Sequence, residues 1–154
     1  AQLDRFLMQI DVDYPGRDAE RQMLLATTSN QESKVTAALS KDELVEIQSL
    51  VRDMPIGDGV VDAILSLVRR GRPGKEAPKL VNEYVTWAPG PRAAQALMLA
   101  VRAKALIEGR AAPSADDVAA LAAPCLKHRM ALNYKARAEG VALSDVIGAL
   151  AGDL

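Results

Sequence analysis

The stretch GPRAAQALMLAVRAKALIEG, residues 90–109, predicts the longest helix of the chain. Pro91 already has the backbone angle that a first helical turn needs, and Gly109 stands where a left-handed cap is expected. Between them runs a narrow apolar face made of Ala94, Leu97, Met98, Val101 and Ala105. Small side chains on this face allow a partner helix to approach closely. The stretch therefore predicts a helix from about Pro91 to Glu108, packed tightly in a helical bundle.

Shorter helices are predicted on both sides of this stretch. Ser40 and Glu43 form an S-x-x-E capping box, and the helix that follows carries one apolar stripe that we expect to face a core. That stripe consists of Leu44, Ile47, Leu50, Val51 and Met54. Further helices are expected over residues 18–27, 58–70, from Ser114 with an interruption at Pro124, and after a cap at Ser144. Residues 28–39 are typical of a linker, and 71–75 of an irregular loop.

The first residues alternate in polarity. Phe6, Met8, Ile10, Val12 and Tyr14 share one face of an extended chain. This period of two predicts a half-buried strand that ends at Pro15-Gly16. A single strand lacks a partner, so it implies a sheet formed elsewhere. The predicted fold class is all-α, a bundle of about five to seven helices preceded by one β-strand.

Composition limits the class of protein. The 154 residues are 49% apolar and 25% charged with a net charge of −1, which predicts one compact domain and excludes a disordered chain. The apolar runs are too short to span a membrane, and the balanced charge disfavours a general nucleic-acid binder. The one cysteine excludes an internal disulfide and is typical of the cytoplasm. The opening Ala1-Gln2-Leu3 has no initiator Met, so we expect a piece of a longer protein.

Several motifs that could form a binding site are better explained by an ordinary role in folding. Cys125 and His128 form C-x-x-H, but the chain has no further Cys or His to complete a zinc site, so no metal is expected. The loop at 71–75, Gly-Arg-Pro-Gly-Lys, lacks the spacing of a phosphate-binding loop.

Two basic sets leave a nucleic-acid contact open, although a cationic helix end is favoured. They are Arg69, Arg70, Arg72, Lys75 and Lys79, and Lys127, Arg129, Lys135 and Arg137. Carboxylate pairs at 42–43 and 116–117 lie at helix starts, where acids are expected.

Arg92 is the strongest candidate for binding an anion. It lies on the first turn of the longest helix, where backbone amides are free and the helix dipole is positive. Pro89 and Pro91 fix the direction of this turn. A guanidinium held there presents a fork of donors to an anion.

Taken together, these segments resemble the MoxR family of AAA+ ATPases. QLDRFL at residues 2–7 and VDYP at 12–15 are similar to the end of that family's ATPase core. GPRA at 90–93, with the long helix and Gly109-Arg110, is similar to its second sensor helix. SADDV at 114–118 and LKHR at 126–129 match the segments that follow. The resemblance covers nearly the whole chain.

The resemblance implies a division into two parts. Residues 1–15 would be the edge of the α/β core, and residues 16–154 a helical lid that closes over ATP, with Pro15-Gly16 as the candidate hinge. Arg92, with Pro91 beside it, would be the sensor arginine that contacts ATP in its own subunit. Arg5 would be the arginine finger that reaches the ATP of a neighbouring subunit. ATP and Mg²⁺ would be cofactors of the full-length protein, and none is expected on this chain alone.

The family also implies partners. These are an upstream ATPase core, neighbouring subunits of a ring, commonly a hexamer, and client complexes that the ATPase assembles or activates. This chain departs from the family's pattern because it contains no phosphate-binding loop and no acidic metal-binding motif, so it should be inactive alone. The alternative is a free-standing helical interaction or DNA-binding module that uses the basic run at 69–79.

Overall fold

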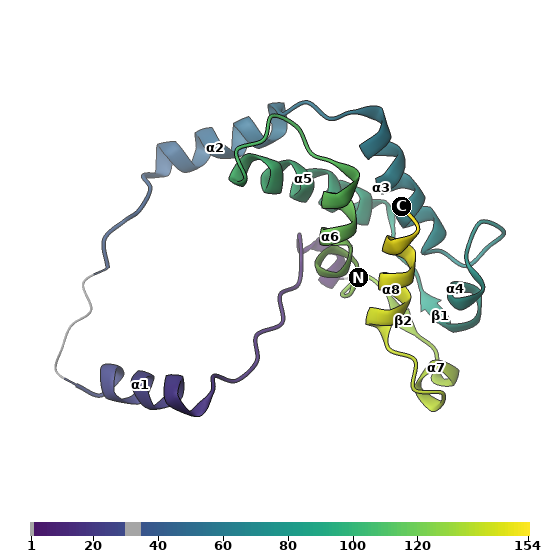
Figure 1. Cartoon of the computed structure of the whole chain (residues 1–154), viewed down its shortest axis with the longest axis horizontal. Helices are drawn as coiled ribbons and strands as arrows, with labels where there is room; N and C mark the ends of the chain where they lie inside the picture. The colour runs from purple at the N-terminus through teal and green to yellow at the C-terminus, as the bar shows by residue number, and fades with distance from the viewer. Residues whose placement is uncertain (1, 30–34) are drawn as a thin grey trace.

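The computed structural model describes residues 2–29 and 35–154, and Figure 1 shows their course. Over these residues the chain forms eight α-helices, one short 3-10 helix and one two-stranded sheet. The elements are η1 (Leu3–Arg5), α1 (Arg17–Thr27), α2 (Lys41–Asp53), α3 (Asp58–Arg70), α4 (Lys79–Tyr84), β1 (Val85–Trp87), α5 (Pro91–Ile107), α6 (Ala115–Leu126), β2 (Ala131–Leu132), α7 (Tyr134–Ala138) and α8 (Leu143–Gly152). The predicted helical bundle is confirmed.

Helix α5 is central to the packing. It contacts α2, α3 and α6, and α6 in turn packs against α8 (Figure 1). Alanines at 93, 96, 100 and 105 are buried on α5, so the neighbouring helices approach its backbone closely. The predicted apolar face is confirmed at Leu97, Val101 and Ala105, whereas Ala94 and Met98 are only half-buried. Leu97 and Val101 of α5 are fully buried, together with large side chains from three other helices, namely Ile64, Leu67, Val118, Leu126, Ile147 and Leu150. Burial of each such side chain contributes about 1.5–3 kcal/mol to folding.

The predicted helix ends at Ser40 and Gly109 are confirmed. The Ser40 hydroxyl accepts from the Glu43 amide at 3.2 Å, and the Glu43 carboxylate accepts from the Ser40 amide at 2.7 Å. Gly109 has φ +70°, the left-handed conformation that glycine adopts without strain. Behind it, the amide of Arg110 donates to the carbonyl of Ala105 at 2.8 Å, which ends α5.

Two predicted helix boundaries are wrong. Pro124 lies inside α6 and does not interrupt it, because Cys125 and Leu126 are fully buried and hold the last turn against the core. The last helix begins after Ala142 and not after Ser144. The amide of Ala142 donates to the Asp145 carboxylate at 3.2 Å. Asp145 therefore caps the start of the helix, although Ala142 has no side-chain acceptor of its own.

The expected strand over residues 6–14 forms no ladder within the described part of the chain. The segment is extended, but Ile10, Val12 and Tyr14 are 74%, 88% and 99% exposed. The sheet lies elsewhere: β1 pairs antiparallel with β2, with Val85 opposite Leu132 and Trp87 opposite Ala131. Alternation alone gave residues 6–14 the pattern of a strand, but a strand also needs a neighbour to accept its hydrogen bonds.

The apolar stripe of α2 is buried at one end only. Met54 is 8% exposed, whereas Leu44, Ile47 and Leu50 are 47%, 37% and 50% exposed. The expectation that the whole stripe faces a core is therefore wrong for the described residues.

Helix α1 lies apart from the bundle (Figure 1), and its Met23, Leu24 and Leu25 are exposed. Residues 30–34 of the expected linker lie outside the described residues.

A buried carboxylate joins the end of α5 to the start of α6. Asp117, 3% exposed, accepts two hydrogen bonds from the Arg110 guanidinium at 2.7 and 2.9 Å and one from the Ser114 amide at 2.8 Å. The ammonium of Lys104 lies 3.1 Å away. The hydrogen bonds from Arg110 are the main cause that holds the pKa of Asp117 well below its usual range, although burial alone would raise it.

Replacing this carboxylate should destabilise the fold. We expect Asp117→Asn to lower the free energy of unfolding at neutral pH by about 2 kcal/mol, because it weakens the charge-assisted hydrogen bonds from Arg110 to a buried group, although Arg110 keeps its ion pair with Glu108. In the unfolded chain the Asp117 carboxyl has a pKa of about 3.9, and in the folded protein its pKa is lower. The ionised carboxylate therefore stabilises the fold above about pH 4, and this stabilisation is lost as the pH falls further. Denaturant unfolding should therefore show the difference from wild type narrowing below about pH 4. Asp116→Asn, an exposed change on the same turn, is the control, and an equal effect of both variants would refute the role of Asp117.

Candidate functional site

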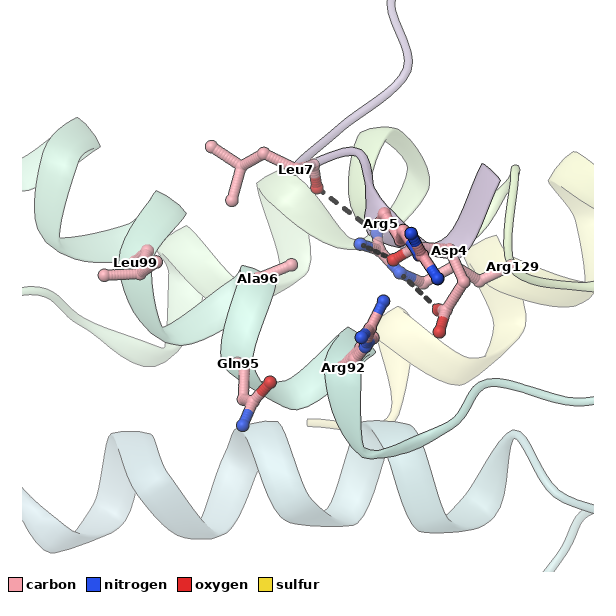
Figure 2. Close-up of a pocket in the computed structure, with 8 residues that line it drawn as sticks. All are labelled: Asp4, Arg5, Leu7, Arg92, Gln95, Ala96, Leu99 and Arg129. Atoms are coloured by element: carbon pink, nitrogen blue, oxygen red, sulfur yellow. Dashed lines mark hydrogen bonds and ion pairs between the residues drawn. The ribbon is translucent and has the colours of Figure 1, made fainter. Parts of the chain in front are cut away.

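The main candidate site is an open pocket between η1 and the first turns of α5. It has a volume of about 480 Å³ and brings Arg5 and Arg92 onto its walls (Figure 2). The remaining lining residues are Asp4, Leu7, Gln95, Ala96, Leu99 and Arg129. Two arginines that the sequence predicts as functional, far apart along the chain, therefore share one pocket.

The position of Arg92 is set by the turn that precedes it. Pro89 is fully buried, and its side chain lies against Gly71, where an added Cβ would come within 3.1 Å of Pro89 Cγ. The Nε–H of Arg72 donates to the Pro89 carbonyl at 2.8 Å. Pro91 then occupies the first position of α5, and Arg92 follows it as an exposed side chain directed into the pocket. The turn is rigid, so the Arg92 backbone has a fixed place.

Arg5 reaches the same pocket from the opposite wall. It is the last residue of η1 and is exposed. Among the described residues, the guanidinium groups of Arg5 and Arg92 have no hydrogen-bond or ion-pair partner. Both guanidinium groups are therefore available for a ligand.

Arg129 is the lining residue that sequence reasoning missed. It is 3% exposed, and all five of its N–H donors have acceptors. Nε donates to Asp4 Oδ1 at 3.1 Å, and the two terminal nitrogens donate to the carbonyls of Asp4, Phe6, Leu7 and Cys125. The sequence contained one signal, the His128-Arg129 pair quoted for the family resemblance, but this pair does not reveal burial.

The charges in the pocket favour an anionic ligand. Three arginines line it against one carboxylate, that of Asp4, which is paired with Arg129. This leaves the charges of Arg5 and Arg92 uncompensated at the pocket wall. Two guanidinium forks beside the positive end of a helix form an arrangement suited to phosphate.

Part of each basic run is paired with carboxylates of the protein. Arg69 pairs with Glu76 at 3.1 Å, Arg70 pairs with Asp153, and Arg72 donates to a backbone carbonyl. In the second set, Lys127 pairs with Asp11 and Lys135 with Glu83, while Arg129 is buried. These contacts weaken the hypothesis of a nucleic-acid surface only in part, because the ion pairs occupy five of the nine cations that could contact backbone phosphates.

The loop at residues 71–75 is held by its own side-chain contacts. The amide of Gly74 donates to Asn82 Oδ1 at 2.8 Å, and the Asn82 Nδ2 group donates to the carbonyls of Gly74 and Ala77. A backbone amide that would contact a phosphate is therefore already used. The contact removes one of the amides that a phosphate cradle in this loop would need.

The C-x-x-H pair also has structural partners. Cys125 is fully buried, and this burial raises the pKa of its thiol to about 11. The Nε2 of His128 lies 3.1 Å from the carbonyl of Phe6. Within residues 2–29 and 35–154, no group of three or more His, Cys, Asp or Glu side chains is placed to hold a metal ion. In the same residues, no helix is long and apolar enough to cross a membrane.

Comparisons with known proteins identify a family and two relatives that this chain resembles. Residues 78–149 match the AAA lid domain family. The chain is 30% identical over 150 residues to the chaperone MoxR1 of Mycobacterium tuberculosis and 29% identical over 148 residues to the protein YeaC of Bacillus subtilis. Each match covers 96% of this chain, but 39% of MoxR1 and 44% of YeaC. The chain thus spans about two fifths of the length of these relatives.

A solved structure shares the same arrangement. A crystal structure of a protein assigned as an ATPase, from Cytophaga hutchinsonii, superposes with a TM-score of 0.89 at 27% identity. The match covers 99% of this chain and 47% of that one. It therefore includes the N-terminal segment that carries Arg5 as well as the helical bundle.

The buried thiol should be unreactive while the protein is folded. At about pH 8 we expect a thiol-specific reagent to modify Cys125 at least about a hundredfold more slowly in the folded chain than in denaturant, because burial and the raised pKa suppress the thiolate. Absorbance of the released chromophore measures both rates. Equal rates would show that Cys125 is accessible and would reopen the question of a ligand role.

Proposed function

We propose that this chain, whose residues 78–149 match the AAA lid domain family and which is similar to the chaperone MoxR1, is the lid of a ring-forming ATPase, with Arg92 and Arg5 contacting the phosphates of bound ATP. The observation that carries the proposal is a pair of guanidinium groups on one pocket that find no partner within the described part of the chain. We keep the names sensor arginine for Arg92, beside Pro91, and arginine finger for Arg5, without assigning either one to the nucleotide of its own or of a neighbouring subunit.

The chemistry of phosphoryl transfer fits such a pair. Charge builds up on the phosphoryl oxygens in the transition state, and positioned cations stabilise it. Mg²⁺ would accompany ATP in the full-length protein, where it bridges phosphate oxygens. The pocket offers no free carboxylate for it among the described residues, because Asp4 is paired with Arg129. This chain would therefore supply arginines, and the nucleotide-binding loop and metal ligands would come from the ATPase core.

The shared pocket adds a constraint to these roles. The family resemblance assigns Arg92 to the ATP of its own subunit and Arg5 to the ATP of a neighbour. Two side chains on one pocket favour instead a single nucleotide for both. Whichever subunit holds that nucleotide, both arginines should act on the ATP of the same subunit, either their own or a neighbour's.

The proposal extends to partners by analogy with the relatives. We propose residues 1–15 as the edge of the ATPase core and 16–154 as the lid, a ring that is commonly a hexamer, and cytoplasmic client complexes that the ATPase assembles or activates. The competing hypothesis, a free-standing interaction or DNA-binding module, is disfavoured because Arg69 and Arg70 of the basic run at 69–79 are paired with carboxylates and the net charge of the chain is −1.

Removing either arginine should slow ATP hydrolysis by the intact gene product. We expect Arg92→Ala to lower kcat by about 10²-fold or more and Arg5→Ala by about 10³-fold, because each removes charge stabilisation from the transition state. Arg137→Ala is the control, an exposed change on α7 outside the pocket. Phosphate release measures turnover, and circular dichroism shows that the helices persist. Unchanged turnover in Arg92→Ala would remove it from the site.

Mixed rings test the shared pocket. Each arginine variant is mixed with a variant whose phosphate-binding loop is disabled. An arginine that acts on a neighbour's ATP restores activity in the mixture, whereas one that acts on its own does not. We expect Arg5→Ala and Arg92→Ala to give the same outcome. Restoration by one variant alone would show that they serve different nucleotides.

The 154-residue chain alone should hydrolyse no ATP. It lacks the G-x-x-x-x-G-K-[ST] loop that binds the phosphates, and arginines alone do not position a nucleotide. Phosphate release above the buffer blank, lost in Arg92→Ala, would overturn this division of labour.

A further inference from the structure

The segment that carries Arg5 is fastened to the helical bundle by one short stretch of chain. Residues 124–129, at the end of α6 and just beyond it, contact residues 4–11 at several points. The amide of Gln9 donates to the Pro124 carbonyl at 2.9 Å, Lys127 pairs with Asp11, His128 Nε2 lies 3.1 Å from the Phe6 carbonyl, and Arg129 binds Asp4, Phe6 and Leu7. We call this set of contacts the finger anchor.

Arg129 is the central group of the finger anchor. Its guanidinium is buried, so it needs an acceptor for every donor, and residues 4–7 supply four of the five. The fifth acceptor is the carbonyl of Cys125 on α6, which fixes the guanidinium to the bundle. A lysine has three donors on a single nitrogen and cannot reach the same spread of acceptors.

We propose that Arg129 is a positioning residue that fixes Arg5 to the lid, so that Arg5 and Arg92 move together as one body when the lid moves. Arg5 lies between two residues that Arg129 binds, Asp4 and Phe6, and its backbone therefore has little freedom. Arg92 is on α5, which packs against both α6 and η1. This inference rests on the proposed function, because it assumes that the two arginines serve a nucleotide.

The chain beyond the anchor is where relative movement would be absorbed. Val12 and Tyr14 are 88% and 99% exposed, whereas Asp4 and Met8 are partly buried. The Pro15-Gly16 corner follows directly. The joint thus lies after Asp11 and not between Arg5 and the bundle, although the resemblance assigns residues 1–15, including Arg5, to the core edge.

A structural role for Arg129 alone must be separated from a positioning role. If Arg129 only stabilises the lid, its loss reduces activity whether or not Arg5 is present. If it acts through Arg5, its loss has no further effect once Arg5 is gone. A double-mutant cycle between the two residues distinguishes these cases.

The cycle is measured as single-turnover ATP hydrolysis by the intact gene product. We expect Arg129→Lys to lower the rate by about 10²-fold, because small displacements of a catalytic group have effects of this size. In the Arg5→Ala background, the same change should lower the rate by less than about twofold. Arg137→Lys is the matched control and should leave the rate unchanged. Equal effects of Arg129→Lys in both backgrounds would overturn the proposal.

Hydrogen exchange provides a readout that does not depend on catalysis. Asp4→Asn removes the carboxylate partner of Arg129 without altering the bundle, and Asp13→Asn is its control in the same segment. We expect Arg129→Lys and Asp4→Asn to speed exchange of the Gln9 amide while the amides of α5 stay protected. Continued protection of Gln9 would refute the anchor. An inactive wild-type protein would instead refute the proposed function, and the exchange result would still stand.

Discussion

The buried guanidinium of Arg129 is the contact on which the candidate site depends. It joins parts of the chain 125 residues apart, and every one of its donors has an acceptor. A buried cation is costly unless it is fully hydrogen-bonded, so this geometry leaves few alternative positions for residues 4–7. The pocket between η1 and α5 exists because the segment is held there. Arg129 thus shapes the site by holding the backbone of residues 4–7, and not by offering its own donors to a ligand in the pocket.

Helix α5 is the frame on which the other wall of the pocket is built. Its first turn is set by Pro89 against Gly71 and by the hydrogen bond from Arg72, and its last turn is closed by Gly109. Beyond that turn, Arg110 binds Asp117 on α6. The two ends of the helix are therefore fixed independently, and its alanine-rich face lets α6 approach closely between them. The same α6 carries Cys125 and leads into Arg129, so both walls of the pocket depend on the contact between α5 and α6.

The elements of this fold were more predictable than their arrangement. Pro91, Gly109 and the Ser40–Glu43 box are local signals, and each marked a helix end that the structure confirms. Arg92 stood out because it lies on the first turn of a long helix. Pro124 misled the prediction, since burial of the following residues outweighs one lost hydrogen bond. The meeting of Arg5 with Arg92 could not be predicted, because it depends on Arg129, whose burial is a property of the packed bundle.

The fold also separates two kinds of arginine that the sequence does not distinguish. Arg129 and Arg92 line the same pocket, but the protein supplies acceptors for the whole guanidinium of Arg129 and, within the described residues, for none of Arg92. An arginine with all its donors satisfied would have to break those contacts to bind a phosphate, whereas Arg5 and Arg92 lose only water. The neighbouring carboxylate strengthens this difference, because Asp4 offsets the charge of Arg129 and leaves the other two charges uncompensated. The number of acceptors that packing brings to each guanidinium therefore decides which arginines build the site and which remain free to serve it.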